Sequence, residues 1–285
     1  MMTSVAKTLE QLSDLIKIKA AIFALPFVIT AMVWAADGLP EARAILWILI
    51  AAFSGRAAAM AFNEFADREY DAKNPRTRNR LLPTGVVSPA QVVAFVIGMS
   101  ALFIFSAAML NRLTLLLSPV ALFILLGYSF INKITYSHPF VGLGQSVGPV
   151  GAWIGIRGEL DLPAVLLGLG VLLWGTGFDA YYDIQDLEFD QEHGYSSIPV
   201  RFGIPATLRF ARFIHALMVA ALVPLYFLLD LNFLYLIGLT LIAALLVYEH
   251  WIIDPRDFTT IRRAFQRVNG AISLVFMTFS IAAIF

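Results

Sequence analysis

The sequence predicts an all-α, polytopic membrane protein with nine transmembrane helices, built as a single domain over residues 1–285. Of the 285 residues, 59% are hydrophobic and only 14% are charged, which is about half the charged share of a soluble domain. The mean hydropathy is +0.78. A helix needs about 20 apolar residues to cross a bilayer, and the chain contains a series of uninterrupted apolar runs close to that length. The sequence has no series of short segments with alternating polarity, as a membrane β-barrel would require.

Nine apolar segments account for the predicted spans, and a shorter segment precedes them. Residues 7–19 place Leu9, Leu12, Leu15 and Ile16 at roughly helical spacing, which predicts an amphipathic helix at the membrane surface. The nine predicted spans are 20–36, 44–63, 91–110, 113–131, 140–156, 163–181, 209–229, 233–252 and 268–285.

The distribution of basic residues predicts the orientation in the membrane. Sixteen of the 20 Lys and Arg residues lie in or beside the N-terminus and segments 64–90, 132–139, 182–208 and 253–267. Three lie in the opposite segments, and Arg56 lies inside a span. Because cytoplasmic loops carry the excess of Lys and Arg, the N-terminus is expected in the cytoplasm and the C-terminus outside the cell inner (cytoplasmic) membrane. Both long polar loops then lie on the cytoplasmic side.

Charge and composition exclude several classes of function. The chain has 20 basic and 20 acidic residues, so it lacks the basic excess with which proteins bind nucleic acid. It contains no cysteine, which excludes disulfides, thiolate metal sites and cysteine nucleophiles. The four histidines show no metal-ligand spacing, and we expect loop or capping roles for His138, His193, His215 and His250.

Polar side chains recur at regular intervals where the second span ends. Asn63, Asp67 and Asp71 occur at positions i, i+4 and i+8, and they form one stripe because each step of four advances a helix by about 40° beyond a full turn. Arg56 lies seven residues before Asn63, on nearly the same face. It is expected to face a polar cavity, either as a substrate contact or as part of a structural ion pair.

A second group of acids follows the sixth span. Asp179 and Asp183 are four residues apart, as are Asp186 and Asp190. All four can share one helical face. Asp179 lies inside the predicted helix, where an acid is rare unless it faces a cavity.

Two acidic stripes that face each other need a positive partner, because clustered carboxylates repel one another. Oxygen ligands without cysteine favour Mg²⁺, which typically bridges carboxylates to substrate phosphates. The two groups therefore predict a diphosphate clamp with Mg²⁺. For any single acid, the alternative is an ordinary ion pair with a nearby arginine in a solvated loop. The basic residues expected to hold the remaining phosphate oxygens are Arg68, Arg76, Arg78, Lys133 and Arg201.

Both acidic segments resemble motifs of a known family. Residues 63–85 read N-x-x-x-D-R-x-x-D-x-x-N-P-R-T-x-x-R-x-L-P-x-G and are similar to the first motif of the UbiA superfamily of membrane prenyltransferases. Residues 179–203 read D-x-x-Y-x-x-x-D-x-x-x-D-x-x-x-G-x-x-S-I-P-x-R-F-G and resemble the second. The motifs follow helices two and six of nine, as in that superfamily, and the resemblance spans nearly the whole chain.

The resemblance implies a site in a central cavity. In the superfamily a prenyl diphosphate binds through Mg²⁺ held by the two motifs, and the corresponding residues here are Asn63, Asp67, Asp71, Asp186 and Asp190. The four aspartates would be the catalytic residues. Asp179 and Tyr182 match the start of the second motif and imply substrate contacts, whereas the role of Asp183 stays open. Lys133, in the segment GYSFINKITYSHP, matches the Tyr/Lys loop of the superfamily.

The segments NPRTRNRLLPTG, GPVGAWIG and SIPVRFG are most similar to the quinone-pathway branch of the superfamily. This resemblance implies transfer of a polyprenyl group from a polyprenyl diphosphate to an aromatic hydroxy acid, in ubiquinone or menaquinone biosynthesis. The acceptor would be 4-hydroxybenzoate or, in the alternative, 1,4-dihydroxy-6-naphthoate. The prenyl chain length and the oligomeric state stay open.

The implied chemistry is electrophilic aromatic substitution. Mg²⁺ and basic residues would draw the diphosphate from the allylic carbon, and apolar helices would keep water from the resulting cation. Two other functions remain open from the sequence. A secondary transporter also carries intramembrane acids, although its site usually lies near the bilayer midplane. A membrane scaffold without catalysis would leave the paired acidic motifs unexplained.

Overall fold

The computed structural model of the chain describes Leu15 and residues 21–131 and 137–285. The predicted surface helix at 7–19, except for Leu15, and Lys133 lie outside the described residues. In chain order the elements are α2 Ala21–Ala35, α3 Ala42–Lys73, α4 Pro89–Ala108, α5 Arg112–Ile131, α6 His138–Arg157, α7 Leu162–Tyr182, the 3-10 helix η2 Asp183–Asp186, α8 Leu187–His193, α9 Ile198–Leu222, α10 Leu225–Leu228, α11 Leu234–Ile252, α12 Phe258–Arg263, the π-helical η3 Ala264–Val268 and α13 Asn269–Ala282.

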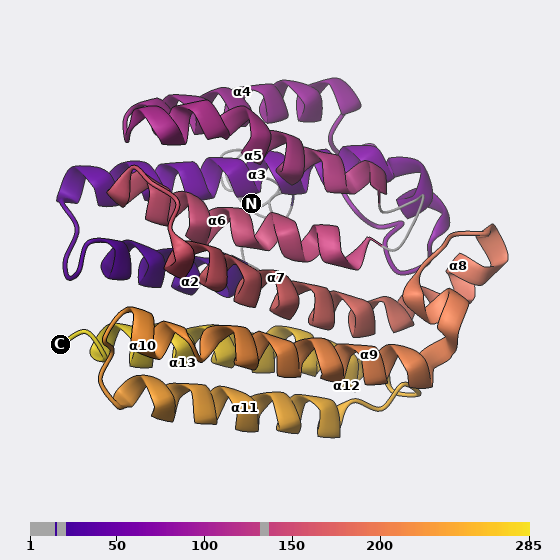
Figure 1. Cartoon of the computed structure of the whole chain (residues 1–285). Coiled ribbons are helices and arrows are strands. Elements are labelled where there is room, and N and C mark those ends of the chain that lie inside the picture. Colours follow the sequence, from indigo (N-terminus) through magenta and orange to yellow (C-terminus); the bar gives the residue numbers. More distant parts are fainter. Residues whose placement is uncertain (1–14, 16–20, 132–136) are drawn as a thin grey trace, which may run out of the picture.

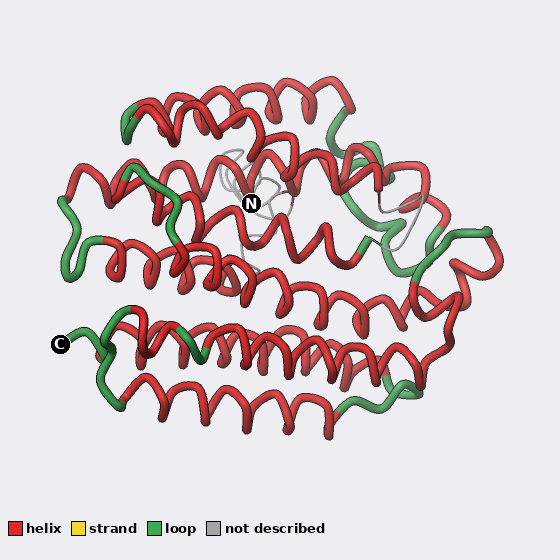
Figure 2. The backbone as a smooth tube through the Cα atoms, in the orientation of Figure 1, coloured by secondary structure: helices red, strands yellow, loops and turns green. Residues whose placement is uncertain are grey.

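The long helices run side by side as a bundle (Figure 1). Helices α3, α4 and α5 form one side, α6, α7 and α2 lie in the middle, and α9, α11 and α13 form the other side. Figure 2 shows that loops lie at the two ends of the bundle. Every predicted span overlaps one long helix of the described residues, so the all-α prediction is confirmed.

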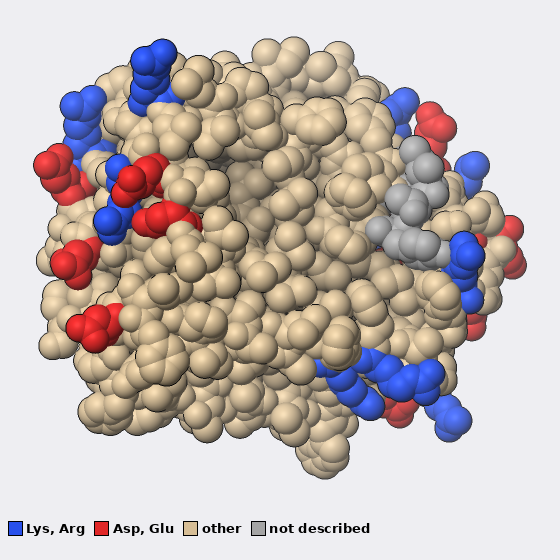
Figure 3. Space-filling view, in the orientation of Figure 1, with Lys and Arg blue, Asp and Glu red and all other residues tan. Residues whose placement is uncertain are grey.

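The surface is that of a membrane protein. In the part of the chain that the structure describes, six helices are long and apolar enough to cross a bilayer. In Figure 3 the charged side chains gather at the two ends of the bundle and a broad band of other residues separates them. Large apolar side chains such as Phe123, Val247 and Trp251 are more than 70% exposed, as expected for side chains that face lipid tails.

The start of one helix differs from the prediction for a reason visible in the chain. Helix α9 begins at Ile198 instead of residue 209, because Pro199 is well suited to the first turn of a helix. Gly203 bends this helix with a left-handed φ of 78°. After a short turn the chain continues as α10 to Leu228, so the candidate span Ile198–Leu228 ends one residue before the predicted residue 229.

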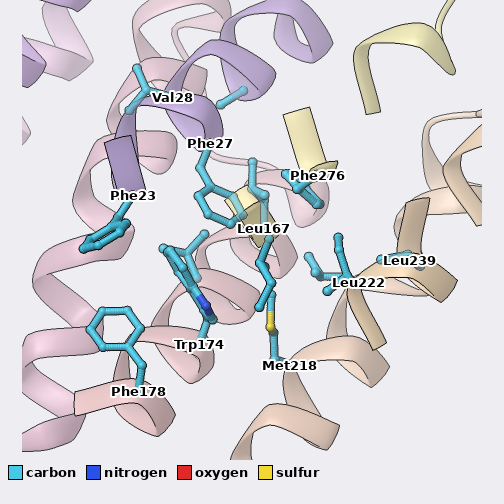
Figure 4. Packing of buried hydrophobic residues seen from close by; sticks show 14 of the residues in the cluster. Phe23, Phe27, Val28, Leu167, Trp174, Phe178, Met218, Leu222, Leu239 and Phe276 are labelled. Carbon is cyan, nitrogen blue, oxygen red and sulfur yellow. The ribbon is translucent and has the colours of Figure 1, made fainter. Parts of the chain in front are cut away.

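Aromatic and glycine residues hold the middle of the bundle together. Phe27 of α2 lies between Trp174 of α7 and Phe276 of α13, at ring-centre distances of 5.0 and 4.8 Å (Figure 4). Helices α6 and α7 approach closely at Gly142 and Gly175, where neither residue has a side chain. A Cβ atom added to Gly142 would lie only 2.1 Å from the Leu172 carbonyl oxygen. This tight pair fixes α7, and α7 carries the second acidic group.

Candidate functional site

The two acidic groups meet at one end of the bundle. Helix α3 extends ten residues beyond its predicted span and carries the first group, while α7, η2 and α8 carry the second (Figure 1). We refer to the five predicted metal ligands as the acid clamp. Each is at most 8% exposed. The members of the acid clamp are Asn63, Asp67, Asp71, Asp186 and Asp190.

Direct hydrogen bonds join the two motifs. Arg76 Nε donates to Asp186 Oδ1 over 2.8 Å, and Arg76 Nη2 donates to the other carboxylate oxygen. Asn74 Nδ2 also donates to Asp186 Oδ1, over 2.9 Å. Tyr70 OH donates to Asp190 Oδ1 over 2.7 Å. The loop after α3 therefore holds Asp186, and α3 itself holds Asp190.

Contacts within the first motif orient its acids. Asn63 Nδ2 donates to Asp67 Oδ2 over 2.8 Å, which is the i, i+4 relationship that the sequence predicts. Arg80 Nη1 donates to Asp71 Oδ2 over 2.6 Å. Arg80 reaches back because a series of turns follows Asn74 and returns the chain toward α3.

A histidine supports the start of the second motif. His138 is fully buried at the first position of α6, and its Nδ1 lies 2.8 Å from Asp179 Oδ2. The Ile198 N–H donates to Nε2 over 3.5 Å, so Nδ1 is assigned as the protonated nitrogen that donates to Asp179. Asp183 Oδ2 lies 3.8 Å from the same ring. His138 thus positions Asp179 in addition to starting its helix.

The electrostatics of Arg76 follow from its surroundings. Burial by itself lowers the pKa of the guanidinium, but the hydrogen bonds and the negative charge of Asp186 outweigh it, so the pKa of Arg76 is raised above its ordinary value. Its guanidinium carbon also lies 5.8 Å from the centre of the Tyr182 ring. Arg76 therefore stays charged beside the acid clamp.

The other predicted basic residues lie elsewhere or have different partners. Arg68 donates to the Phe65 carbonyl, and its guanidinium lies over the Phe65 ring. Arg78 is exposed, and Arg201 is exposed beside the Phe202 ring. Arg56 is partly buried in α3, and among the described residues its Nε has no hydrogen-bond partner. Arg76, in contrast, is bonded directly to Asp186 of the acid clamp.

Several site residues escaped sequence reasoning. Asn74 and Arg80 are part of the quoted first motif, so their place in that motif was the available signal. Tyr70 lies between Asp67 and Asp71 and is directed to the second motif instead. His138 contacts Asp179 across 41 residues of sequence, and no local pattern indicates that contact.

Glu64 is buried and accepts a hydrogen bond from the Leu82 N–H, which attaches the motif loop to α3.

The loop or capping roles expected for the histidines are partly wrong. His193 caps α8, since its Nδ1 lies 2.9 Å from the Phe189 carbonyl oxygen. In contrast, His215 and His250 lie within α9 and α11, with ring nitrogens 3.0 Å apart. The prediction failed because the two helices bring together residues that are 35 positions apart in the sequence.

The donor set of the acid clamp fits Mg²⁺. It offers four carboxylates and one amide, and oxygen donors of this kind are the ligands that Mg²⁺ prefers. Arg76 and Arg80 offset two of the carboxylates. Asp67 and Asp190 accept hydrogen bonds from a neutral amide and a neutral hydroxyl. Carboxylates clustered from the two motifs favour a cation between them.

A cavity of about 630 Å³ lies beside the residues that hold Asp186. Asn74 and Arg76 line it from the first motif, and Gln185 and Glu188 line it from the second. Phe258 and Arg262 of α12 close its far side. Since Asn74 and Arg76 also hold Asp186, the cavity and the acid clamp share a wall.

Comparison with known families gives one match over most of the chain. The model of the UbiA prenyltransferase family matches residues 24–279, and this range contains both acidic motifs and His138.

Individual relatives agree with this match. A protein from Pseudomonas aeruginosa named 4-hydroxybenzoate octaprenyltransferase is 33% identical over 245 residues, covering 85% of this chain and 82% of the relative. A protein of the same name from Aliivibrio fischeri is 28% identical over 260 residues, covering 90% and 89%.

Solved structures share the fold. The apo structure of a UbiA homolog from Aeropyrum pernix superposes with a TM-score of 0.83 at 28% identity, covering 92% of this chain and 97% of the homolog. A UbiA homolog from Archaeoglobus fulgidus, solved with GPP and Mg²⁺, gives a TM-score of 0.68 at 19% identity and covers 96% and 99%.

Proposed function

The chain belongs to the UbiA prenyltransferase family, and we propose that it transfers a polyprenyl group from a polyprenyl diphosphate to an aromatic hydroxy acid of the 4-hydroxybenzoate type. The observation that carries this proposal is the direct bonding of Asp186 to Arg76 and Asn74, which joins the two acidic motifs into one site. The names of the relatives from Pseudomonas aeruginosa and Aliivibrio fischeri support the choice of acceptor.

Residues of the chain would perform the binding steps. Arg76 would exchange its bond with Asp186 for a bond with a diphosphate oxygen, because a guanidinium matches both groups with the same planar donors. His138 would hold Asp179 in place toward the substrate. The apolar helices around the site would exclude water from the allylic carbon while the diphosphate leaves.

Mg²⁺ would be held by Asn63, Asp67, Asp71, Asp186 and Asp190. When bound, it would supply positive charge that stabilises the diphosphate as a leaving group. The Archaeoglobus fulgidus homolog bound to GPP and Mg²⁺ supports this assignment. A Cd²⁺-bound structure of the same homolog is a reason to test more than one divalent ion.

The pathway and the orientation belong to the same proposal. We place the protein in the cell inner membrane, with the N-terminus and the acid clamp at the cytoplasmic face. Sixteen of the 20 basic residues lie in or beside the segments on that predicted side, as the positive-inside rule requires. Lys133, which lies outside the described residues, would be a further phosphate contact. Ubiquinone biosynthesis fits 4-hydroxybenzoate as acceptor, and menaquinone biosynthesis fits 1,4-dihydroxy-6-naphthoate as the alternative.

Product mass spectrometry tests the proposal. The purified protein in detergent is incubated with Mg²⁺, polyprenyl diphosphates of several chain lengths, and either 4-hydroxybenzoate or 1,4-dihydroxy-6-naphthoate. We expect a prenylated acid with release of diphosphate. Product from the naphthoate alone would move the assignment to the alternative acceptor. Flux of substrate into liposomes without any prenylated product would instead support a transporter and refute the proposal.

A further inference from the structure

A second polar cluster lies on the face of α7 opposite Asp179. Tyr181 follows Asp179 by two residues, which places the two side chains about 200° apart around the helix. Tyr181 contacts Glu249 of α11, and Glu249 neighbours His215 of α9. The cluster is completed by His250 and by Asn269 at the start of α13. The proposed prenyl transfer uses none of these residues.

Three of these side chains direct potential ligand atoms to one point. His215 Nδ1 lies 3.0 Å from His250 Nε2 and 3.4 Å from Glu249 Oε2. One ligand atom from each residue lies within 4.8 Å of the other two. His215 is 1% exposed and Glu249 is 0% exposed, so both are shielded from water.

Neighbouring groups fix the orientation of two of these ligands, Glu249 and His215. Glu249 Oε1 accepts hydrogen bonds from Tyr181 OH at 2.7 Å and from Asn269 Nδ2 at 2.6 Å. His215 Nε2 lies 3.3 Å from the Trp174 carbonyl oxygen, so Nε2 is assigned as the protonated nitrogen and the Nδ1 lone pair faces the cluster. Metal-binding histidines and carboxylates are oriented in this way by a second set of hydrogen bonds.

The remaining carboxylate oxygen is unsatisfied. Within the described part of the chain, Glu249 Oε2 has no hydrogen-bond partner although it is buried. Buried polar atoms in proteins are nearly always paired, because water no longer solvates them. The unpartnered atom is the one that lies 3.4 Å from His215 Nδ1.

We propose that His215, Glu249 and His250 bind a Zn²⁺ ion that ties α9 to α11. Two imidazoles and one carboxylate are typical zinc ligands, whereas Mg²⁺ prefers oxygen alone. Bonds of about 2.0–2.1 Å in a tetrahedral arrangement place ligand atoms about 3.3 Å apart. The distances of 3.0 and 3.4 Å lie close to that separation.

The fourth coordination position opens on a cavity. His215 and His250 line a cavity of about 580 Å³ between α9 and α11, together with Arg212 and Trp251. One carboxylate and two neutral imidazoles leave a bound Zn²⁺ with a net charge of +1. Because Arg212 lines the same cavity, its charge would favour a small anion, such as hydroxide, as the fourth ligand.

Zinc content of the intact protein tests the proposal. The protein is purified through a tag without histidine, equilibrated with Zn²⁺ in excess Mg²⁺ to fill oxygen-only sites, and desalted. Metal is then counted by mass spectrometry in the wild type, His215→Gln and Glu249→Gln. His193→Gln is the matched control, since it makes the same change at an exposed histidine of α8. The thermal midpoint with and without Zn²⁺ is measured in parallel.

We expect about one zinc per chain in the wild type and in His193→Gln, and a loss of that zinc in His215→Gln and Glu249→Gln. Zn²⁺ should raise the thermal midpoint of the first pair and leave the second pair unchanged. X-ray absorption at the zinc edge should show two imidazole ligands in the wild type. This measurement needs no variant, so it tests the zinc site even if a variant does not fold. Oxygen ligands alone, or equal zinc in the wild type and His215→Gln, overturns the proposal.

Discussion

Arg76 and Asp186 are separated by 110 residues of sequence and form a two-point ion pair, with Arg76 Nε donating to Asp186 Oδ1 over 2.8 Å and Nη2 donating to Oδ2. The Arg76 side chain is 31% exposed and that of Asp186 is 6% exposed. One partner is therefore within reach of a ligand while the other is held inside. This relationship places the loop of the first motif over the start of α8.

Replacing Arg76 should impair substrate use. We expect Arg76→Ala to lower kcat/KM for the polyprenyl diphosphate by about ten- to a hundredfold, because a hydrogen bond to a charged group contributes about 1.5–3 kcal/mol. Arg76→Lys should restore only part of the activity, since an ammonium lacks the planar two-point geometry. Steady-state kinetics at matched protein concentration measures both. Arg256→Ala removes the same charge from an exposed loop and serves as the control. Wild-type kinetics in Arg76→Ala would remove Arg76 from the site.

Replacing Asp67 should lower turnover without destabilising the fold. Asp67→Asn keeps the size of the side chain but removes a buried charge from the acid clamp. We expect kcat to fall by at least about a hundredfold, because the metal ion that stabilises the leaving group would lose a ligand. The thermal midpoint should be unchanged or higher, because repulsion among the acids decreases.

Glu69→Gln is the matched control for this change, because Glu69 belongs to the same helix and its side chain is 81% exposed. Its turnover should equal that of the wild type. Turnover near the wild-type rate in Asp67→Asn would rule out the metal role of the first motif.

The sequence predicted the elements of this site better than their contacts. The stripe from Asn63 to Asp71 follows from helical periodicity, and the structure confirms that α3 continues through it. The second group is different because the α-helix ends at Tyr182 and a 3-10 turn carries Asp183 to Asp186. The predicted shared face of these acids requires a continuous α-helix. The 3-10 turn has fewer residues per turn than an α-helix, so it changes the direction of each later side chain.

Partners from distant segments could not be read from local patterns. His138, His215 and His250 have no repeating spacing, and their roles depend on which helices pack together. Basic residues were predicted by proximity in sequence alone. Arg68 shows the weakness of that argument, since its guanidinium lies over Phe65 of its own helix.

His138 should act on the reaction through Asp179. His138→Ala removes the donor to Asp179 Oδ2, and we expect kcat/KM to fall by about tenfold or more, the effect of about 1.5 kcal/mol. His138→Asn places an amide N–H near the position of Nδ1 and should recover most of the loss. A purely structural role would lower the thermal midpoint of both variants without this difference in kinetics. Equal kcat/KM for the two variants would contradict the positioning role.

The cysteine-free chain allows a direct test of orientation. Single cysteines are introduced at the exposed residues Lys73 and Glu192, beside the two motifs, and at Glu159 in the exposed turn between α6 and α7. A membrane-impermeant maleimide applied to intact cells and inverted vesicles should label the first two only from the cytoplasmic side and Glu159→Cys only from outside. Labelling of Lys73→Cys from outside intact cells would contradict the proposed orientation.

The close contact between α6 and α7 gives a prediction about stability. A Cβ atom at Gly142 would lie 2.1 Å from the Leu172 carbonyl oxygen and 2.6 Å from Thr176 Oγ1, so the helices would have to separate. We expect Gly142→Ala to destabilise the fold by about 1–3 kcal/mol, the usual cost of overpacking. It should also reduce activity, because α6 carries His138 and α7 carries Asp179.

Gly151→Ala is the control on the same helix, where an added Cβ meets no other described residue within 4 Å. That variant should be neutral or more stable, since alanine favours a helix over glycine by about 1 kcal/mol. Thermal unfolding in detergent compares the two, and equal midpoints would show that α6 and α7 can separate without loss.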